Sequence, residues 1–139
     1  MTVWSRLAAL LTPRPPIPDI ATPPPPGKAR LHLFHGKFRS EANARAYCHA
    51  SADEMHPVQL TIDLPGAFVD PAHVTVAFGA AVRPMLDGWF DPGLVEDMML
   101  HMHGADTLVV VAEDAFAGLP YTLNNTPRLT YIGPYLVPA

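Results

Sequence analysis

Seven histidines and one cysteine are the first side chains to consider for metal or nucleophilic chemistry in this sequence. His101 and His103 would share a face on a strand, but they fall in the last turn of a predicted helix. There, residues two apart diverge by about 200°, and histidines favour the negative end of the helix dipole. His32 and His35 have no carboxylate at ligand-like spacing. We therefore expect no metal site, with an unrecognised hydrolytic or metal centre among His32, His35 and His73 as the alternative.

Cys48 and His49 form the one cysteine–histidine neighbour pair of the sequence. Adjacent residues of a helix do not face each other, and a catalytic cysteine needs a base and a third group around it. Cys48 is therefore predicted to be a small core residue. Neighbouring carboxylates such as Glu113 and Asp114 do not make a catalytic pair. The chain also has no phosphate-binding loop, dinucleotide-binding fingerprint or nucleophile elbow. We expect a protein that is not an enzyme and needs no cofactor.

The length and composition of the chain limit the class of protein that it can form. The 139 residues amount to about one domain. Apolar residues make up 49% and charged residues 16%, which excludes a wholly disordered chain. No apolar run reaches the roughly 18 residues of a membrane helix. A single cysteine excludes an internal disulfide framework. The free cysteine and the lack of an export-signal pattern predict a cytoplasmic protein.

Proline and charge divide the chain unevenly. Eight of the 17 prolines lie within residues 13–26, which predicts an extended, polyproline-like linker. Before it, Trp4, Leu7 and Leu11 have helical spacing and predict a short helix. Residues 1–28 are therefore expected to be a short helix and a linker. Residues 1–45 carry seven basic and two acidic groups, a net of +5. Residues 46–139 carry two basic and eleven acidic groups, a net of −9.

Residues 29–139 have the pattern of one α+β domain. Helices are predicted at 41–50, where Ser40 is the N-cap, and after the cap Asp91, with Gly104 closing that helix. Strands are predicted at 30–35, 73–78 and 106–112, and a final hairpin at 121–123 and 129–136. Residues 58–64 alternate and predict a short strand, with a distorted helical turn as the alternative. We expect a mainly antiparallel sheet of about five strands, with the two helices on one face.

A short string near the start of this domain matches a known pattern. It consists of a strand, a glycine, an aromatic residue, a Ser-Glu helix start and a second aromatic residue, at Gly36, Phe38, Ser40, Glu41 and Tyr47. This stretch resembles the opening of the immunity protein 22 family of bacterial polymorphic-toxin systems. That family usually has tryptophan where Phe34 stands here.

Two later segments are similar to the same family. Asp63 and Asp70 occupy the places of its acidic middle segment, while His73 replaces its usual second aspartate. Residues 107–112 and 129–136 resemble its apolar strand and its final strand. The resemblance covers about residues 31–136 and leaves out the N-terminal helix and linker.

The resemblance implies an α+β domain that binds and neutralises a toxin, often a nuclease, made by the same cell. The acidic charge of residues 46–139 agrees with this, because a nuclease needs a basic surface to hold phosphates. An acidic surface would also repel nucleic acid, so we expect a basic protein as partner. The candidate contact residues are Asp63, Asp70, Asp87, Asp91 and Glu96, with Trp89 and Phe90 as aromatic anchors. Trp89 could equally cap the core beside Gly88.

The charge and proline patterns leave a second function open. The N-terminal helix could act as a tether, with Trp4, Leu7 and Leu11 as its contact side chains. A polyproline linker of about 17 residues could span up to about 50 Å. The chain would then be a structural or adaptor protein that docks on a larger assembly. The two functions differ in whether residues 1–28 are required.

Overall fold

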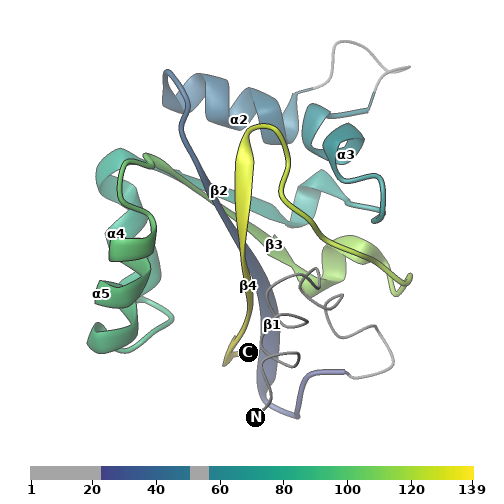
Figure 1. The fold of residues 1–139 in the computed structure, drawn as a ribbon. Helices are drawn as coiled ribbons and strands as arrows, with labels where there is room; N and C mark the ends of the chain where they lie inside the picture. Colours follow the sequence, from purple (N-terminus) through teal and green to yellow (C-terminus); the bar gives the residue numbers. More distant parts are fainter. Residues whose placement is uncertain (1–22, 51–56) are drawn as a thin grey trace, which may run out of the picture.

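The computed structural model describes residues 23–50 and 57–139 (Figure 1). Within them, one antiparallel sheet contains β1 (Lys28–Gly36), β2 (Val74–Phe78), β3 (Thr107–Ala112) and β4 (Leu129–Pro138). The strand order is β2-β3-β1-β4, so β1 and β3 are central. The α+β class and the antiparallel sheet are confirmed. Trp4, Leu7, Leu11 and the first part of the predicted linker lie outside the described residues.

Four α-helices lie in the described part of the chain: α2 (Glu41–His49), α3 (Gln59–Asp63), α4 (Val82–Asp87) and α5 (Pro92–His101). Short 3₁₀ turns complete the set, at η1 (Pro71–His73), η2 (Gly79–Ala81) and η3 (Glu113–Phe116). The two predicted helices are confirmed, together with their N-caps; the second helix ends at His101 with Met102 as its C-cap, before the predicted closing residue Gly104. Ser40 accepts a hydrogen bond from the Asn43 amide, and Asp91 accepts one from the Leu94 amide. None of these helices is long and apolar enough to cross a membrane.

Within residues 58–64 the structure has the helix α3 (Gln59–Asp63), so the predicted short strand is wrong and the alternative, a helical turn, is correct. Leu60 and Leu64 are both buried, and they are four residues apart, which is the spacing of one helical face. Ile62, which alternation would also bury, is half exposed. Residues 121–123 form no strand either. Their chain runs instead past Gly66, whose carbonyl accepts a hydrogen bond from the Thr122 amide at 2.8 Å.

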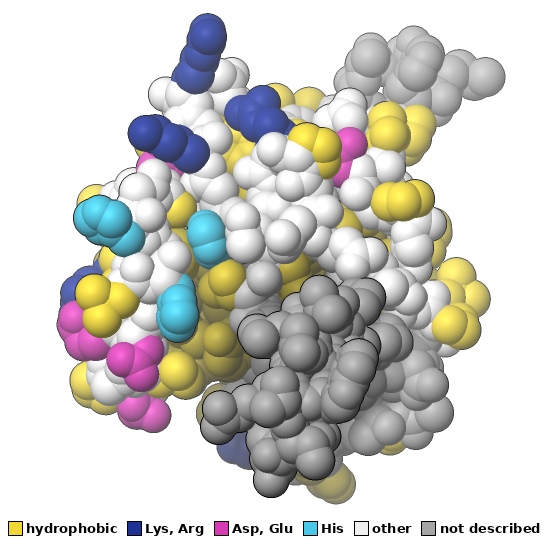
Figure 2. Space-filling view, viewed as in Figure 1, with side chains coloured by type: hydrophobic (Ala, Val, Ile, Leu, Met, Phe, Trp, Pro, Cys, Tyr) yellow, Lys and Arg dark blue, Asp and Glu magenta, His cyan; other side chains and the backbone are white. Residues whose placement is uncertain are grey.

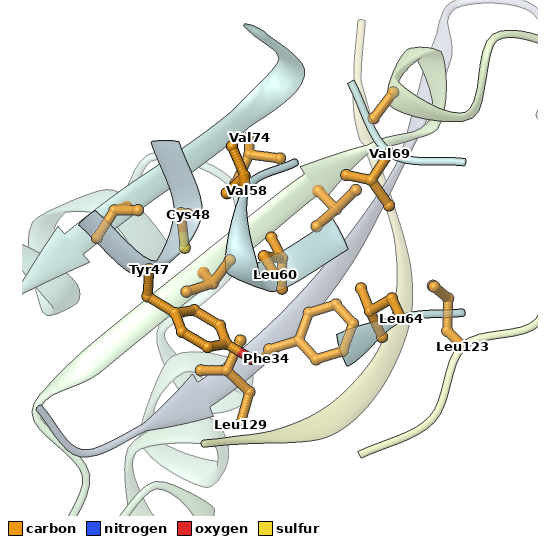
Figure 3. Packing of buried hydrophobic residues seen from close by; sticks show 14 of the residues in the cluster. Phe34, Tyr47, Cys48, Val58, Leu60, Leu64, Val69, Val74, Leu123 and Leu129 are labelled. Atoms are coloured by element: carbon orange, nitrogen blue, oxygen red, sulfur yellow. The ribbon is translucent and has the colours of Figure 1, made fainter. Parts of the chain in front are cut away.

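The helices cover both faces of the sheet, which corrects the prediction that they lie on one face. One hydrophobic cluster joins α2 and α3 to Phe34, Val109 and Val111 (Figure 3). The other joins α4 and α5 to Leu33, Val110 and their neighbours. The physical reason lies in β3, whose residues 107–111 are all buried. A strand that is apolar on both sides requires a layer on each side.

A bulge in β4 sets how its side chains meet these two layers. The register with β1 shifts between Leu33 and Phe34, where Gly133 has a φ of 120°. Tyr131 therefore belongs to the cluster under α2 and α3, whereas Val137 belongs to the cluster under α4 and α5. A glycine is required at this φ because other residues rarely adopt it.

Candidate functional site

The structure divides the seven predicted contact residues between the two faces of the sheet. Asp63 ends α3 and Asp70 precedes η1, so both belong to the layer that contains α2. The other five lie in the pair of helices on the opposite face: Asp87, Trp89, Phe90, Asp91 and Glu96. The fold therefore brings five of the predicted residues together and leaves two elsewhere.

Asp63 and Asp70 already have partners within the protein. The Tyr47 hydroxyl donates to Asp63 Oδ2 at 2.5 Å, and Gln59 Nε2 donates to Asp63 Oδ1 at 2.9 Å. Burial and the hydrogen bond to Asp63 raise the pKa of Tyr47. Asp70 accepts a hydrogen bond from the Ala72 amide at 3.0 Å and so caps η1. Both carboxylates have structural roles at these places.

The turn between α4 and α5 is built by local hydrogen bonds. The amides of Trp89 and Phe90 both donate to the carbonyl of Leu86, at 3.0 and 2.9 Å. Asp91 then caps α5, and Pro92 follows in its first turn, where no amide donor is needed. Leu86 and Val95 are fully buried beneath the turn. This pair of helices presents residues 87–91 at one end.

Trp89 and Phe90 form the rim of the core beneath α4 and α5. Both are partly buried and pack against that hydrophobic cluster. Their rings meet edge to face at 6.3 Å, and Phe90 meets Tyr135 of β4 at 5.3 Å. The two aromatic residues therefore support the core and also remain accessible in part.

The outward face of α5 combines carboxylates with an exposed leucine. Val95 and Met98 are buried, whereas Glu96, Asp97 and Leu100 point outward, and Leu100 is 74% exposed. Figure 2 shows acidic side chains gathered with apolar ones over this region. We call Asp87, Trp89, Glu96, Asp97 and Leu100, with their neighbours on α4 and α5, the acidic helix surface.

The charge of this surface is negative even after its internal ion pair. Glu96 pairs with Arg83 of α4. Residues 82–101 contain four carboxylates and one arginine, a net of −3. Asp97 and Leu100 were not among the predicted contact residues. The helical stripe of buried residues already pointed to them, because it leaves positions 96, 97 and 100 on the opposite side.

A second group of polar side chains is buried beneath the other face of the sheet. His32 is fully buried between two partners. Its Nδ1 lies 3.0 Å from the Tyr131 hydroxyl, and its Nε2 lies 2.7 Å from Glu113 Oε2. The Tyr121 hydroxyl donates to Glu113 Oε1 at 2.8 Å, and Arg30 Nη1 donates to the same oxygen at 3.3 Å. We call these five residues the His32 cluster.

The His32 cluster keeps its carboxylate ionised. Burial pushes the pKa of Glu113 upward, but hydrogen bonds from His32 and Tyr121 and the charge of Arg30 outweigh this, so that the pKa is lowered. Burial and the hydrogen bond to Glu113 raise the pKa of Tyr121. A carboxylate held in this way is a poor proton acceptor. The arrangement therefore satisfies buried polar groups and fixes η3 against β1.

The histidines that were candidates for metal binding are placed apart. His32 belongs to the buried cluster, and His35 is partly buried near His101. His73 lies elsewhere, with its Nε2 4.0 Å from Asp70 Oδ2. Burial and the charge of His101 lower the pKa of His35. Among the described residues, no three His, Cys, Asp or Glu side chains come together as a metal site would require. Cys48 is fully buried, as predicted, and burial raises its pKa to about 12.

Comparisons of this chain with models of protein families, with curated proteins and with solved structures found no match.

Proposed function

We propose that this protein is a bacterial immunity-type protein, which binds a basic toxin domain through the acidic helix surface and neutralises it. The observation that supports this most directly is the outward face of α5, where Leu100 is 74% exposed beside Asp97 and Glu96. A large exposed apolar side chain one turn from two carboxylates suits a basic protein partner. The leucine supplies contact area, and the carboxylates select the partner by charge.

The acidic helix surface also includes aromatic side chains that a protein partner could contact. It spans two packed helices and a turn that holds the partly exposed rings of Trp89 and Phe90. Aromatic side chains at the edge of a rigid element are common anchors of binding energy. The carboxylates of Asp87 and Asp97 would speed association with a positively charged partner, more strongly at low salt.

A nuclease toxin is the kind of partner that this charge fits. A nuclease holds phosphates on a basic surface, and an acidic protein that occupies this surface blocks access of the nucleic acid. The resemblance of residues 31–136 to the immunity protein 22 family motivates the same function. The toxin would be made by the same cell, so we place its neutralisation in the cytoplasm.

A rescue assay tests this function. The protein encoded by the adjacent upstream gene is expressed in bacteria with and without this chain, and surviving cells are counted. We expect growth to collapse with the neighbour alone and to recover with both proteins. A harmless neighbour, or a neighbour that kills in both cases, would contradict the immunity function.

The same assay separates the alternative, a tethered structural or adaptor protein. Removing residues 1–22 deletes the predicted helix but keeps the hydrogen bonds that join Lys28 to Pro25 and Ala139 to Gly27. An immunity domain should still rescue growth without residues 1–22. An adaptor that docks through Trp4, Leu7 and Leu11 should lose its function.

A further inference from the structure

The face of the sheet opposite α4 and α5 carries a cleft that is lined by basic and amide side chains. It has a volume of about 520 Å³ and lies between α2, the start of α3 and the loop before β4. Its lining includes Arg39, Asn43, Gln59 and Arg128, with Phe38 and Tyr47 beneath them. Figure 2 shows the Lys and Arg side chains gathered at the end where Figure 1 places α2. We call this the basic cleft.

Arg128 is held in position over the floor of the basic cleft. Its guanidinium carbon lies 4.5 Å from the centroid of the Phe38 ring, and that ring meets Tyr47 at 5.5 Å. Phe38 is buried, while Arg128 is exposed. A guanidinium that rests on an aromatic ring offers its other side as a flat surface on which a planar ring can stack.

Among the described residues, the carboxylates on the neighbouring elements form no ion pair with Arg39 or Arg128, because their contacts are with other groups. Glu41 pairs with Arg45 at 3.0 Å. Asp63 is held by Tyr47 and Gln59. Asp106 accepts hydrogen bonds from the Phe38 amide and the Thr107 hydroxyl, at 3.0 and 2.8 Å. Within residues 23–50 and 57–139, Arg39 has no ion-pair partner. None of the described residues that line the cleft carries a carboxylate.

From this arrangement we infer that the basic cleft binds a small organic phosphate of the nucleoside monophosphate class. Arg39 and Arg128 supply two guanidinium groups, whose paired N–H donors match the oxygens of a phosphate. Asn43 supplies an amide that can pair with the edge of a base, and Gln59, whose Nε2 donates to Asp63, offers its carbonyl oxygen. The volume of the cleft lies in the range of small-molecule sites. This site is independent of the acidic helix surface, which lies across the sheet.

The charge of the rest of the protein favours a small ligand over a nucleic acid. Residues 46–139 carry a net charge of −9, which repels a long polyanion that extends beyond the cleft. A single phosphate needs only the local cations. The basic cleft therefore suits one nucleotide and not a polymer.

Calorimetric titration of the full-length protein with AMP tests this inference, in a phosphate-free buffer of low ionic strength. We expect one AMP per chain. Adenosine and inorganic phosphate should each bind at least about tenfold more weakly, because each lacks half of the contacts. Arg39→Glu should weaken AMP binding about tenfold or more, and Arg128→Lys should weaken it although the charge is kept.

Lys28→Glu is the matched control for Arg39→Glu. It makes the same change of charge at an exposed residue, at the far end of β1, about 26 Å along the strand from Gly36. We expect it to change AMP binding less than about twofold. Equal losses in the two variants, or equal affinity for inorganic phosphate and AMP, would overturn the inference. So would tighter binding of a single-stranded oligonucleotide than of AMP, which would indicate a nucleic-acid surface instead.

Discussion

His32 and Glu113 show how single residues stabilise this fold. They are 81 positions apart in sequence, yet His32 Nε2 lies 2.7 Å from Glu113 Oε2. The sequence could not predict the pair, because it depends on the register that sets His32 opposite Val111 and so brings Glu113 near. Cys48 was predictable, because its place on the apolar face of a helix already made it a core residue.

Acidification should weaken the protein through Glu113. Its pKa in the folded protein is below the ordinary value of 4.5, so its stabilising contribution is present above about pH 4.5 and is lost as the pH falls through the folded pKa. Glu113→Gln should be less stable than wild type near pH 6, and the difference should shrink as the pH falls. Urea denaturation at a series of pH values measures this. A difference that stays constant down to about pH 3 would contradict the assignment.

Cys48 should be unreactive in the folded protein. It is fully buried, and burial raises its pKa to about 12, so that almost no thiolate forms near neutral pH. Reaction with a thiol-specific chromogenic reagent should be slow in native buffer and rapid in denaturant. Fast labelling of the native protein would show that the helix α2 opens readily.

At the scale of elements, predictions succeeded where a local signal was complete. Ser40 and Asp91 mark the helix starts, and both cap their helices in the structure. The predictions failed where packing decided between strand-like alternation and helical spacing. Residues 58–64 alternate like a strand, but the buried pair Leu60 and Leu64 follows the helical spacing. The helix α4 is only six residues long and contains Pro84 in its first turn, which hid it from a search for periodicity.

Because β1 runs close to the residues that precede β4, alanine substitutions at two glycines should differ in their effect on stability. A Cβ at Gly36 would lie 2.4 Å from the Arg128 carbonyl, whereas a Cβ at Gly88 would come no closer than 3.4 Å to the Met85 carbonyl. Gly36→Ala should therefore cost roughly 1–3 kcal/mol of unfolding free energy, because backbone must move. Gly88→Ala should stay within about 0.5 kcal/mol of wild type. Chemical denaturation compares them, and equal stability of the two variants would contradict the packing described here.

At the scale of the whole molecule, carboxylates lie on both faces of the sheet, whereas several Lys and Arg side chains lie together at one end. Carboxylates gather over α4 and α5, and cations gather at the end formed by α2 and the loop before β4 (Figure 2). The excess of negative charge after residue 45 was evident from the sequence. The sequence did not show that this negative charge is divided between the two faces of the sheet. Asp63 and Asp70 are near Asp87 in the sequence but not in the fold. The fold places them on the other side of the sheet.

The most direct test of the proposed function is the rescue assay with reversed charges on one face. Asp97→Lys changes the acidic helix surface, and a lysine in the second half of α5 is compatible with the helix dipole. Asp114→Lys makes the same change of charge on η3, which lies on the opposite face. Soluble amounts and circular dichroism spectra of the variants are compared first.

We predict that wild type and Asp114→Lys rescue cells from the upstream protein, whereas Asp97→Lys combined with Leu100→Ala does not. Loss of rescue on this face alone would support neutralisation through the acidic helix surface. Full rescue by the Asp97→Lys, Leu100→Ala variant would contradict it.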